Sequence, residues 1–373
     1  MPISEVRAAT LVAPRTFEIR SYPRPNLDLG GAILAVEVCA LCGTDYSVFR
    51  GDYERPNGLP GDVIPGHEVV GTIEEARPEV LLQWGLELGD RVAIEPNIPC
   101  GSCPHCVVGQ YVACTSRTPA PLAHGFVPTS VEPALWGGYA ESMYLSPRTV
   151  IHRVPSGLDA GTASLFNVVA NGFQWACDIP NLRYGQSVLV LGAGQRGIAA
   201  VAAARAAGAG QIIATGLRSD ARRLEAAVAL GADATILADE GDVVESVRAL
   251  TDGQLVDVAI DCSAGATQPV IDAIRSVVPG GTVVLAGMKH GRGADGFPVD
   301  EVVVRQIRVQ GALSASFDAY RQALRFLATP MGAKLATYRT HELPLEQIAF
   351  ALQVLGGERP EEQPIYVSVA PRA

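Results

Sequence analysis

One stretch, Val188 to Gly208, constrains the fold more than any other part of the sequence. It opens with the apolar run Val188–Leu191, which predicts a strand buried on both faces, and it closes with an alanine-rich helix. A turn with glycines at three positions, Gly192, Gly194 and Gly197, separates the strand from the helix. This order of strand, glycine turn and helix predicts a βα unit in a parallel sheet.

The spacing of these glycines indicates a dinucleotide site. Gly192 would permit the tight turn, Gly194 would let the backbone approach a pyrophosphate, and Gly197 would let the helix pack closely on the strand. The first helical amides, those of Gln195 and Arg196, would face the phosphate oxygens. A plain βα unit can also contain such glycines, but the flanking strand and helix supply the context that the motif needs. We therefore expect a dinucleotide to bind here.

Composition narrows the class of protein. A chain of 373 residues has room for more than one domain, and 48% hydrophobic with 18% charged residues is typical of a well-packed soluble protein. The net charge of −10 argues against nucleic acid or an anionic membrane as partner. The sequence has no signal-peptide pattern and no apolar run near the ~18 residues of a membrane span, which predicts a cytoplasmic protein. Its eight cysteines would be reduced there, and they point to metal binding or chemistry before disulfides.

The pattern of the chain changes after residue 155. The part before it consists of short β-rich runs between Gly, Pro and Asp breakers, typical of a small barrel, and the proline-rich segment 120–132 fits a surface loop. The part after it alternates strands and helices, which predicts a doubly wound parallel sheet. Apolar spacing predicts helices within 317–327 and 345–355, and a last strand covers Ile365–Val369.

Four cysteines lie within fifteen residues, at Cys100, Cys103, Cys106 and Cys114. Four thiolates in one loop can close a tetrahedral zinc site with no open position, which predicts a structural zinc. The alternatives are unligated thiols or an iron–sulfur cluster, whose motifs also begin C-x2-C-x2-C but place the fourth cysteine at a different spacing. The spacing therefore favours zinc.

A second group of ligand-type residues consists of Cys42-Gly43-Thr44-Asp45, at a strand end, and Gly66-His67-Glu68. A lone cysteine or histidine is more often a packing residue than a ligand. Together with the four-cysteine loop and the glycine turn, this ordered set resembles the zinc-containing medium-chain alcohol dehydrogenases. The resemblance covers essentially the whole chain, and the cysteine loop is its most specific element.

The resemblance implies an α/β protein with two domains. A GroES-like β-barrel catalytic domain, residues 1–165 and 315–373, would be interrupted by a Rossmann dinucleotide-binding domain with a doubly wound parallel sheet, residues 166–314. The resemblance also implies that Cys42 and His67 bind a catalytic zinc.

Further roles around this zinc are implied by the same resemblance. Asp45 would orient His67. Thr44 would hydrogen-bond the substrate hydroxyl and pass on its proton, and Glu68 would be able to approach the metal when ligands exchange. A zinc ion with an open position lowers the pKa of a bound hydroxyl, so an alcohol can release hydride to a nicotinamide near neutral pH.

The sequence departs from this family at two positions. Ser47 stands where relatives have a proton-relay histidine, so the route from Thr44 to solvent would be altered or would run through water. Asn167 stands where relatives have Cys, Glu or Asp as the third zinc ligand, and an amide oxygen is a weaker donor. Asn167 or Glu68 would complete the shell, or the site would be partly occupied. We expect a zinc that is present and loosely held.

The cofactor is expected to be NADP in preference to NAD. NAD-binding proteins usually carry Asp or Glu at the end of the second Rossmann strand, where this sequence reads Gly216-Leu217-Arg218-Ser219. The missing acid removes repulsion against a 2′-phosphate, and Arg218 and Ser219 can hydrogen-bond to it. The pattern Gly-x-Arg looks like that of NADP-dependent relatives. The alternative is that Asp220 reaches the ribose.

The family position of two other residues implies cofactor contacts: Asn171 on the nicotinamide side, and Gly287 at a strand end that lines the crevice. The expected partners are a small-molecule alcohol or carbonyl substrate and further copies of the chain, because family members are homodimers or homotetramers. The identity of the substrate does not follow from the sequence.

The expected activity is interconversion of an alcohol and a carbonyl by hydride transfer with NADP(H), with zinc polarising the substrate oxygen. A quinone or enoyl reductase of the same fold, without a catalytic metal, is the first alternative. Asn167 and Ser47 favour it, whereas Cys42 and His67 oppose it. A dinucleotide-binding regulatory protein without turnover is the second alternative.

Overall fold

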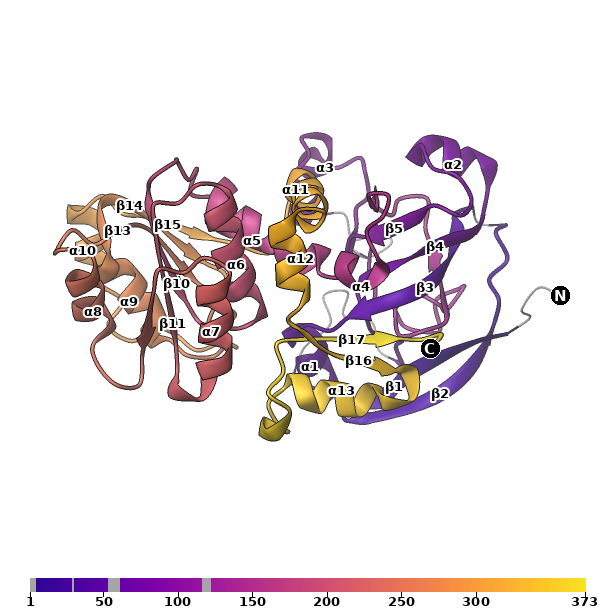
Figure 1. Cartoon of the computed structure of the whole chain (residues 1–373). Coiled ribbons are helices and arrows are strands. Elements are labelled where there is room, and N and C mark those ends of the chain that lie inside the picture. Colours follow the sequence, from indigo (N-terminus) through magenta and orange to yellow (C-terminus); the bar gives the residue numbers. More distant parts are fainter. Residues whose placement is uncertain (1–4, 29, 53–60, 116–121) are drawn as a thin grey trace. The chain divides into compact units, whose positions relative to one another are not determined.

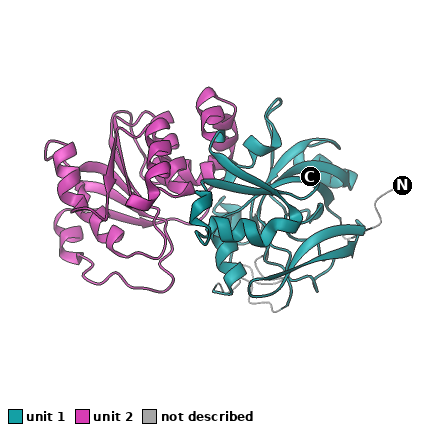
Figure 2. Cartoon of the chain, turned by 60° about the horizontal axis from the view of Figure 1, so that its bottom comes forward, with its two compact units in different colours: residues 1–167, 336–373 teal, residues 168–335 magenta. Residues whose placement is uncertain are grey.

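Two units make up the chain (Figure 2). The computed structural model describes the whole sequence except residues 1–4, 29, 53–60 and 116–121. The first unit combines Met1–Asn167 with Ala336–Ala373, and the second unit is Val168–Leu335. Within the described residues, no helix is both long enough and apolar enough to cross a membrane.

The first unit is built around a seven-stranded sheet, in the order β16-β17-β3-β4-β5-β9 with β8 paired to β3 (Figure 1). The strands of this sheet are β3 (Ala32–Ala40), β4 (Glu68–Ala76), β5 (Arg91–Ile94), β8 (Ser142–Leu145), β9 (Ile151–Arg153), β16 (Arg339–Pro344) and β17 (Tyr366–Ala370). Two further pairs are β1 (Glu5–Ala13) with β2 (Thr16–Pro23) and β6 (Asn97–Ile98) with β7 (Leu122–Ala123). All pairings except β16 with β17 are antiparallel, as expected for a β-rich unit with short connections.

The helices of this unit are short. They are α1 (Gly43–Arg50), α2 (Pro78–Trp84), α3 (Pro104–Val107), α4 (Ala160–Ala163) and α13 (Ile348–Leu355). The apolar face of α13 completes the core of the unit, because Ile348, Leu352 and Val354 are buried with residues of β1, β3 and β17. The chain thus returns to the first unit at its end, and β17 hydrogen-bonds to β3.

The second unit contains a six-stranded, fully parallel sheet in the order β12-β11-β10-β13-β14-β15. Successive residues of β10 (Ser187–Leu191) enter two different cores: Val188 and Val190 belong to one, and Leu189 and Leu191 to the other. The strand is therefore buried on both faces, and helices cover both faces of the sheet (Figure 1). The prediction of a doubly wound parallel sheet is confirmed.

The remaining elements of the second unit alternate along the chain. They are α5 (Phe166–Phe173), which starts in the first unit, a π-helical turn (Gln174–Asp178), α6 (Gln195–Ala206), β11 (Gln211–Gly216), α7 (Ala221–Ala229), β12 (Ala234–Leu237), α8 (Val243–Leu250), β13 (Val256–Asp261), α9 (Gln268–Ser276), β14 (Val277–Leu285), α10 (Val299–Val304), β15 (Arg308–Gly311), α11 (Phe317–Leu327) and α12 (Pro330–Ala336).

The segment 315–335 lies with the second unit, whereas the domain limits expected from the sequence place it with the first. Side chains explain this position. The Phe326 ring of α11 packs edge-on against Phe173 at 5.7 Å, and the backbone N–H of Ser316 donates to Gln174 at 3.1 Å. Helix α11 is therefore held by the residues that precede β10.

Candidate functional site

Cys42 and His67, predicted as catalytic zinc ligands, and Asp45, predicted to orient His67, converge at the start of α1. Asp45 Oδ2 accepts the backbone N–H of Cys42 at 3.0 Å, and Asp45 Oδ1 lies 3.2 Å from Nδ1 of His67. The other ring nitrogen of His67, Nε2, lies 3.1 Å from Sγ of Cys42. All three side chains are buried. One carboxylate thus accepts the N–H of Cys42, the N-cap of α1, and also lies beside the ring of His67.

Burial and charge act against each other in this cluster. Burial alone would raise the pKa of Asp45 and lower that of His67, but the contact between the two reverses both effects. The pKa of Asp45 is therefore lowered, and Asp45 and Cys42 together raise the pKa of His67 well above its usual value. The site consequently stabilises an anionic carboxylate beside a positively charged or metal-bound imidazole.

The donor set of this cluster fits a zinc ion. The ligand atoms of Cys42, Asp45 and His67 all lie within 4.8 Å of one another. Thiolate and imidazole are the ligands zinc prefers, and a carboxylate bonded to the far side of a ligating histidine is the usual support for such a site. Cys42 and His67 would hold the metal, with Asp45 behind His67.

Asn167 and Glu68, the two candidates for the third ligand, are bonded to each other. Asn167 Nδ2 donates to Glu68 Oε1 at 2.6 Å, and both side chains are buried. The amide must present its nitrogen to the carboxylate, because an amide oxygen in that place would face a negative charge. Any bond from Asn167 to a metal would therefore have to come from Oδ1.

The neighbouring hydroxyls occupy the first turns of α1. Thr44 is half-buried in the first turn, beside the buried Asp45. Ser47, for which the sequence predicted an altered proton relay, donates its hydroxyl to the carbonyl oxygen of Gly43 at 3.1 Å. This bond turns the Ser47 proton back into the helix.

Part of the predicted surface loop 120–132 instead belongs to this site. Residues 120 and 121 lie outside the described residues, but His124, Phe126 and Val127 are buried, so the surface prediction is wrong for them. The Phe126 ring lies 5.3 Å from the ring of His67. The apolar residues within the proline-rich segment were the sequence signal for this burial.

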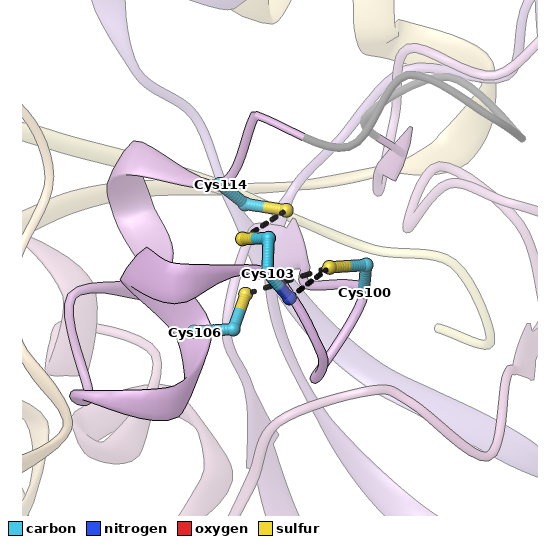
Figure 3. Close-up of side chains that lie close together, drawn as sticks. All are labelled: Cys100, Cys103, Cys106 and Cys114. Atoms are coloured by element: carbon cyan, nitrogen blue, oxygen red, sulfur yellow. Dashed lines mark hydrogen bonds between the residues drawn. The ribbon is translucent and has the colours of Figure 1, made fainter.

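The four cysteines form a second cluster, with their sulfur atoms pointing toward one another (Figure 3). The Sγ atoms of Cys100 and Cys106 are 3.8 Å apart, and those of Cys103 and Cys114 are 3.9 Å apart. Zinc–sulfur bonds of about 2.3 Å in a tetrahedron place the sulfurs about 3.8 Å from each other. The geometry therefore fits a tetrahedral zinc held by thiolates only.

Backbone N–H groups in this loop stabilise the thiolate form of Cys100. The N–H groups of Ser102 and Cys103 lie 3.4 and 3.2 Å from Sγ of Cys100 and lower its pKa to about 5. Burial raises the pKa of Cys106 to about 12, so a metal that bound there would have to displace a proton.

A buried hydrogen-bond network that the sequence did not suggest anchors the cysteine loop. Tyr111, which lies between the third and fourth cysteines, donates its hydroxyl to Glu95 at 2.7–2.8 Å. Glu95 is fully buried just after β5, and His152 Nε2 lies 2.7 Å from its Oε1. A carboxylate directly after the apolar strand Arg91–Ile94 was the available signal.

Replacing Tyr111 with phenylalanine is expected to cost about 1–3 kcal/mol of unfolding free energy, because a buried carboxylate loses a donor. Zinc should also leave the four-cysteine loop faster, as measured with a chromophoric chelator. Tyr184→Phe is the control, since that side chain is 92% exposed. Equal stability and equal zinc release in the two variants would show that Tyr111 does not anchor the loop.

The glycine turn has the backbone geometry that its sequence requires. Gly192 has a φ of 100°, which residues with a side chain rarely adopt. A Cβ on Gly197 would lie 1.9 Å from the carbonyl oxygen of Gly192, so the first turn of α6 can pack this closely on the glycine turn only with glycine at that position. Among the described residues, apart from Gly194 and its immediate chain neighbours, no atom lies within 4 Å of a Cβ built on Gly194, which leaves the backbone open to a ligand.

Two predicted cofactor contacts, Asn171 and Arg196, touch each other. Arg196 Nε donates to Asn171 Oδ1 at 2.7 Å, and the guanidinium lies 6.0 Å from the centre of the Trp175 ring. Gly287 lies two residues after the end of β14 (Val277–Leu285), and a Cβ there would approach the carbonyl oxygen of Ser263 to 1.9 Å. The carboxyl ends of β13 and β14 are therefore packed backbone to backbone at this edge of the sheet.

Gly216 is the last residue of β11, and the 3-10 turn Arg218–Asp220 follows it. Asp220, the alternative ribose ligand, is engaged within the unit: its Oδ2 accepts the N–H of Leu217 at 3.1 Å, and its Oδ1 lies 3.0 Å from Arg223. The carboxylate of Asp220 is therefore occupied within the turn and its helix.

Two protein families match large parts of the chain. Residues 29–156 match the family described as alcohol dehydrogenase GroES-like domain, and residues 197–329 match the family described as zinc-binding dehydrogenase. A protein of Mycobacterium tuberculosis described as a probable alcohol dehydrogenase is 40% identical, over 98% of each chain.

Two solved structures are similar over nearly their full length. An alcohol dehydrogenase of Thermotoga maritima has a TM-score of 0.86 at 22% identity, covering 98% of this chain and 99% of that chain, and shows the fold. A protein of Sinorhizobium meliloti described as a putative zinc-binding dehydrogenase bound to NADP has a TM-score of 0.81 at 26% identity, covering 99% of this chain and 100% of that chain. The predicted α/β fold, with a GroES-like domain and a Rossmann-like parallel sheet, is confirmed. The chain is an oxidoreductase that belongs to the zinc-containing medium-chain alcohol dehydrogenase family.

Proposed function

We propose that this alcohol dehydrogenase-type enzyme interconverts a small-molecule alcohol and its carbonyl with NADP(H), using a zinc ion held by Cys42 and His67. The observation that carries the proposal is the buried contact of Cys42, His67 and Asp45 at the start of α1. When bound, zinc would supply a Lewis acid that polarises the substrate oxygen, and the nicotinamide would supply the hydride acceptor.

Residues of the chain would orient the zinc ligand His67 and take up the proton of the substrate hydroxyl. Asp45 would keep the proton of His67 on Nδ1, which leaves Nε2 as the ligand atom beside Cys42. Thr44 Oγ1 would accept the proton of the substrate hydroxyl and release its own toward solvent. Because Ser47 donates to Gly43, we propose that this proton leaves through water.

We propose that the catalytic zinc is the more weakly held of two. The four-cysteine loop offers four thiolates, whereas the other cluster offers Cys42 and His67, with Asn167 and Glu68 tied to each other. Neutral amide oxygen is a weak third donor. Limited chelation of the purified protein should therefore remove one zinc per chain first, and activity should fall in parallel with it.

Asn167→Cys is expected to slow the release of this first zinc at least about tenfold, because it adds a thiolate to the ligand set. The zinc in the four-cysteine loop serves as an internal standard, since its release should be the same in both proteins. An unchanged release rate of the first zinc would exclude Asn167 from the metal shell.

NADP is the proposed preferred cofactor. Arg218 follows β11 where NAD-dependent proteins usually carry an acid, and Gly216, Arg218 and Ser219 would surround the 2′-phosphate. The relative from Sinorhizobium meliloti is described as bound to NADP. The ratio of kcat/KM for NADP and NAD with a reactive alcohol tests the proposal, and a higher value with NAD would refute it.

A quinone or enoyl reductase without catalytic metal is the second candidate. The Asn167–Glu68 bond favours it, because the two candidate third ligands are hydrogen-bonded to each other and would have to bind a metal while keeping or breaking that bond. Reduction of an activated alkene with NADPH that survives chelation would select this candidate. Loss of alcohol oxidation on chelation, regained with zinc, would select the first.

We also propose that the first unit is the catalytic domain, that the second binds the dinucleotide, and that the enzyme is a homodimer or homotetramer. Sedimentation equilibrium of the purified protein tests the assembly state, and a monomer at micromolar concentration would refute it.

A further inference from the structure

Arg218, the residue proposed to bind the 2′-phosphate, already has acidic partners. Its guanidinium forms an ion pair with the carboxylate of Glu240. Its backbone N–H lies 3.0 and 3.2 Å from the two carboxylate oxygens of Asp239. Both the side chain and the backbone of Arg218 therefore contact carboxylates, and these carboxylates lie in the segment that follows β12.

The sheet topology explains how these residues meet. β12 pairs with β11 in parallel, with Gly216 opposite Leu237, so both strands end at the same edge of the sheet. Arg218 follows β11, and Asp239 and Glu240 follow β12. The sequence lacks an acid directly after β11, and the segment after β12 supplies acids at this place instead, about 20 residues later in the chain.

We propose that Glu240 is a specificity-determining residue that competes with the adenosine 2′-phosphate for Arg218. This inference rests on the proposed NADP site. In the cofactor-free protein, Glu240 neutralises the guanidinium. A 2′-phosphate must displace this carboxylate or bind beside it against like-charge repulsion, whereas the neutral 2′-hydroxyl of NAD can donate a hydrogen bond to Asp239 or Glu240.

The ion pair therefore makes the difference between the affinities for NADP and NAD smaller. Without Glu240, Arg218 would offer its full charge to a 2′-phosphate, and NADP would bind more tightly. The ion pair is open to solvent, with 76% of the Arg218 side chain and 39% of the Glu240 side chain exposed, so its strength is that of a surface pair. We expect a change in NADP affinity of about three- to fivefold.

The test uses Glu240→Gln, which keeps the shape of the side chain and removes its charge. Titration calorimetry would give the Kd of the full-length protein for NADP, for NAD and for adenosine 2′,5′-bisphosphate, which carries the 2′-phosphate without the nicotinamide. The variant should bind NADP and the bisphosphate about three- to fivefold more tightly, and NAD equally or more weakly. The gain should shrink as salt is raised, because exposed charges are screened.

Two controls separate the ion pair from a general charge effect. Glu225→Gln removes the same charge from an exposed position on α7 in the same unit and should leave all three Kd values unchanged. In an Arg218→Met background, Glu240→Gln should no longer tighten NADP, because its partner is gone.

The outcomes distinguish this inference from the cofactor proposal. Suppose that the wild-type protein prefers NADP and that Arg218→Met removes this preference. If Glu240→Gln then changes the Kd for NADP no more than Glu225→Gln does, the competition by Glu240 is refuted and the NADP proposal stands. If NAD binds more tightly than NADP and Arg218→Met leaves NADP binding unchanged, both proposals fall. If Glu240→Gln still tightened NADP binding in the Arg218→Met background, the proposed competition for Arg218 would also be refuted.

Discussion

Replacing Cys42 with alanine is expected to lower kcat/KM for alcohol oxidation about a thousandfold and to remove one zinc ion per chain. Cys42 is one of the two residues proposed to hold this zinc, and its Sγ lies 3.1 Å from Nε2 of His67. Loss of a Lewis acid at the substrate oxygen forfeits several kcal/mol of transition-state stabilisation, which corresponds to about three orders of magnitude in rate. Steady-state kinetics and metal analysis measure the two effects on the same sample.

Cys39→Ala provides the matched control for this variant. Cys39 is also a buried thiol, it lies on β3 only a few residues before Cys42, and burial raises its pKa well above the usual value. Its removal should leave the zinc content at that of the wild type and kcat/KM within about threefold, because Cys39 lies outside the ligand cluster. A Cys42→Ala protein that kept its zinc and its rate would refute the assignment of Cys42 as a ligand.

The elements that the sequence predicted are those whose pattern is local. The run Val188–Leu191 lies within a strand buried on both faces, and its glycine turn has the expected geometry, because three glycine positions and an apolar run specify this turn without distant residues. Where the helices end was not visible in the same way. Residues 160–178 divide into α4, α5 and a π-helical turn: the N–H of Leu165 bonds three residues back to Thr162, and that of Ile179 bonds five residues back to Gln174.

The candidate site was predictable where residue types alone indicate chemistry. Cys42, Asp45 and His67 meet as the motif order implied, and the four cysteines meet within one loop. Contacts between distant segments were not predictable. Asn167 lies 99 residues from its partner Glu68, so no local pattern shows that the two candidate ligands bind each other.

The same limit applies to charged pairs at strand ends. Asp239 and Glu240 look like ordinary loop acids in the sequence, and only the parallel pairing of β11 and β12 brings them to Arg218. Asp261 looks like the polar end of an apolar strand, and only the fold shows which cation it meets. Sequence therefore indicates which residues carry chemistry, and topology decides which of them interact.

Replacing Lys289 with methionine is expected to destabilise the second unit by about 3–5 kcal/mol and to lower its Tm by about 10 °C. Lys289 Nζ lies 2.6 Å from Oδ2 of Asp261, which is fully buried at the end of β13, and it donates to the carbonyl oxygen of Ser263 at 2.7 Å. Its loss would leave a buried carboxylate without its counter-ion. Urea unfolding and scanning calorimetry measure the change.

The sequence contains one other lysine, Lys334, which is exposed on α12 and makes Lys334→Met the matched control. That variant should lose less than about 1 kcal/mol. The double variant Lys289→Met with Asp261→Asn should be more stable than Lys289→Met alone, because removing both charges avoids the cost of an unpaired buried carboxylate. If the double variant were less stable than the single one, the stabilising role would belong to the other hydrogen bonds of Asp261, which include the backbone N–H of Ser263 at 3.0 Å. The two variants therefore separate the ion pair from the hydrogen bonds that join the carboxyl ends of β13 and β14.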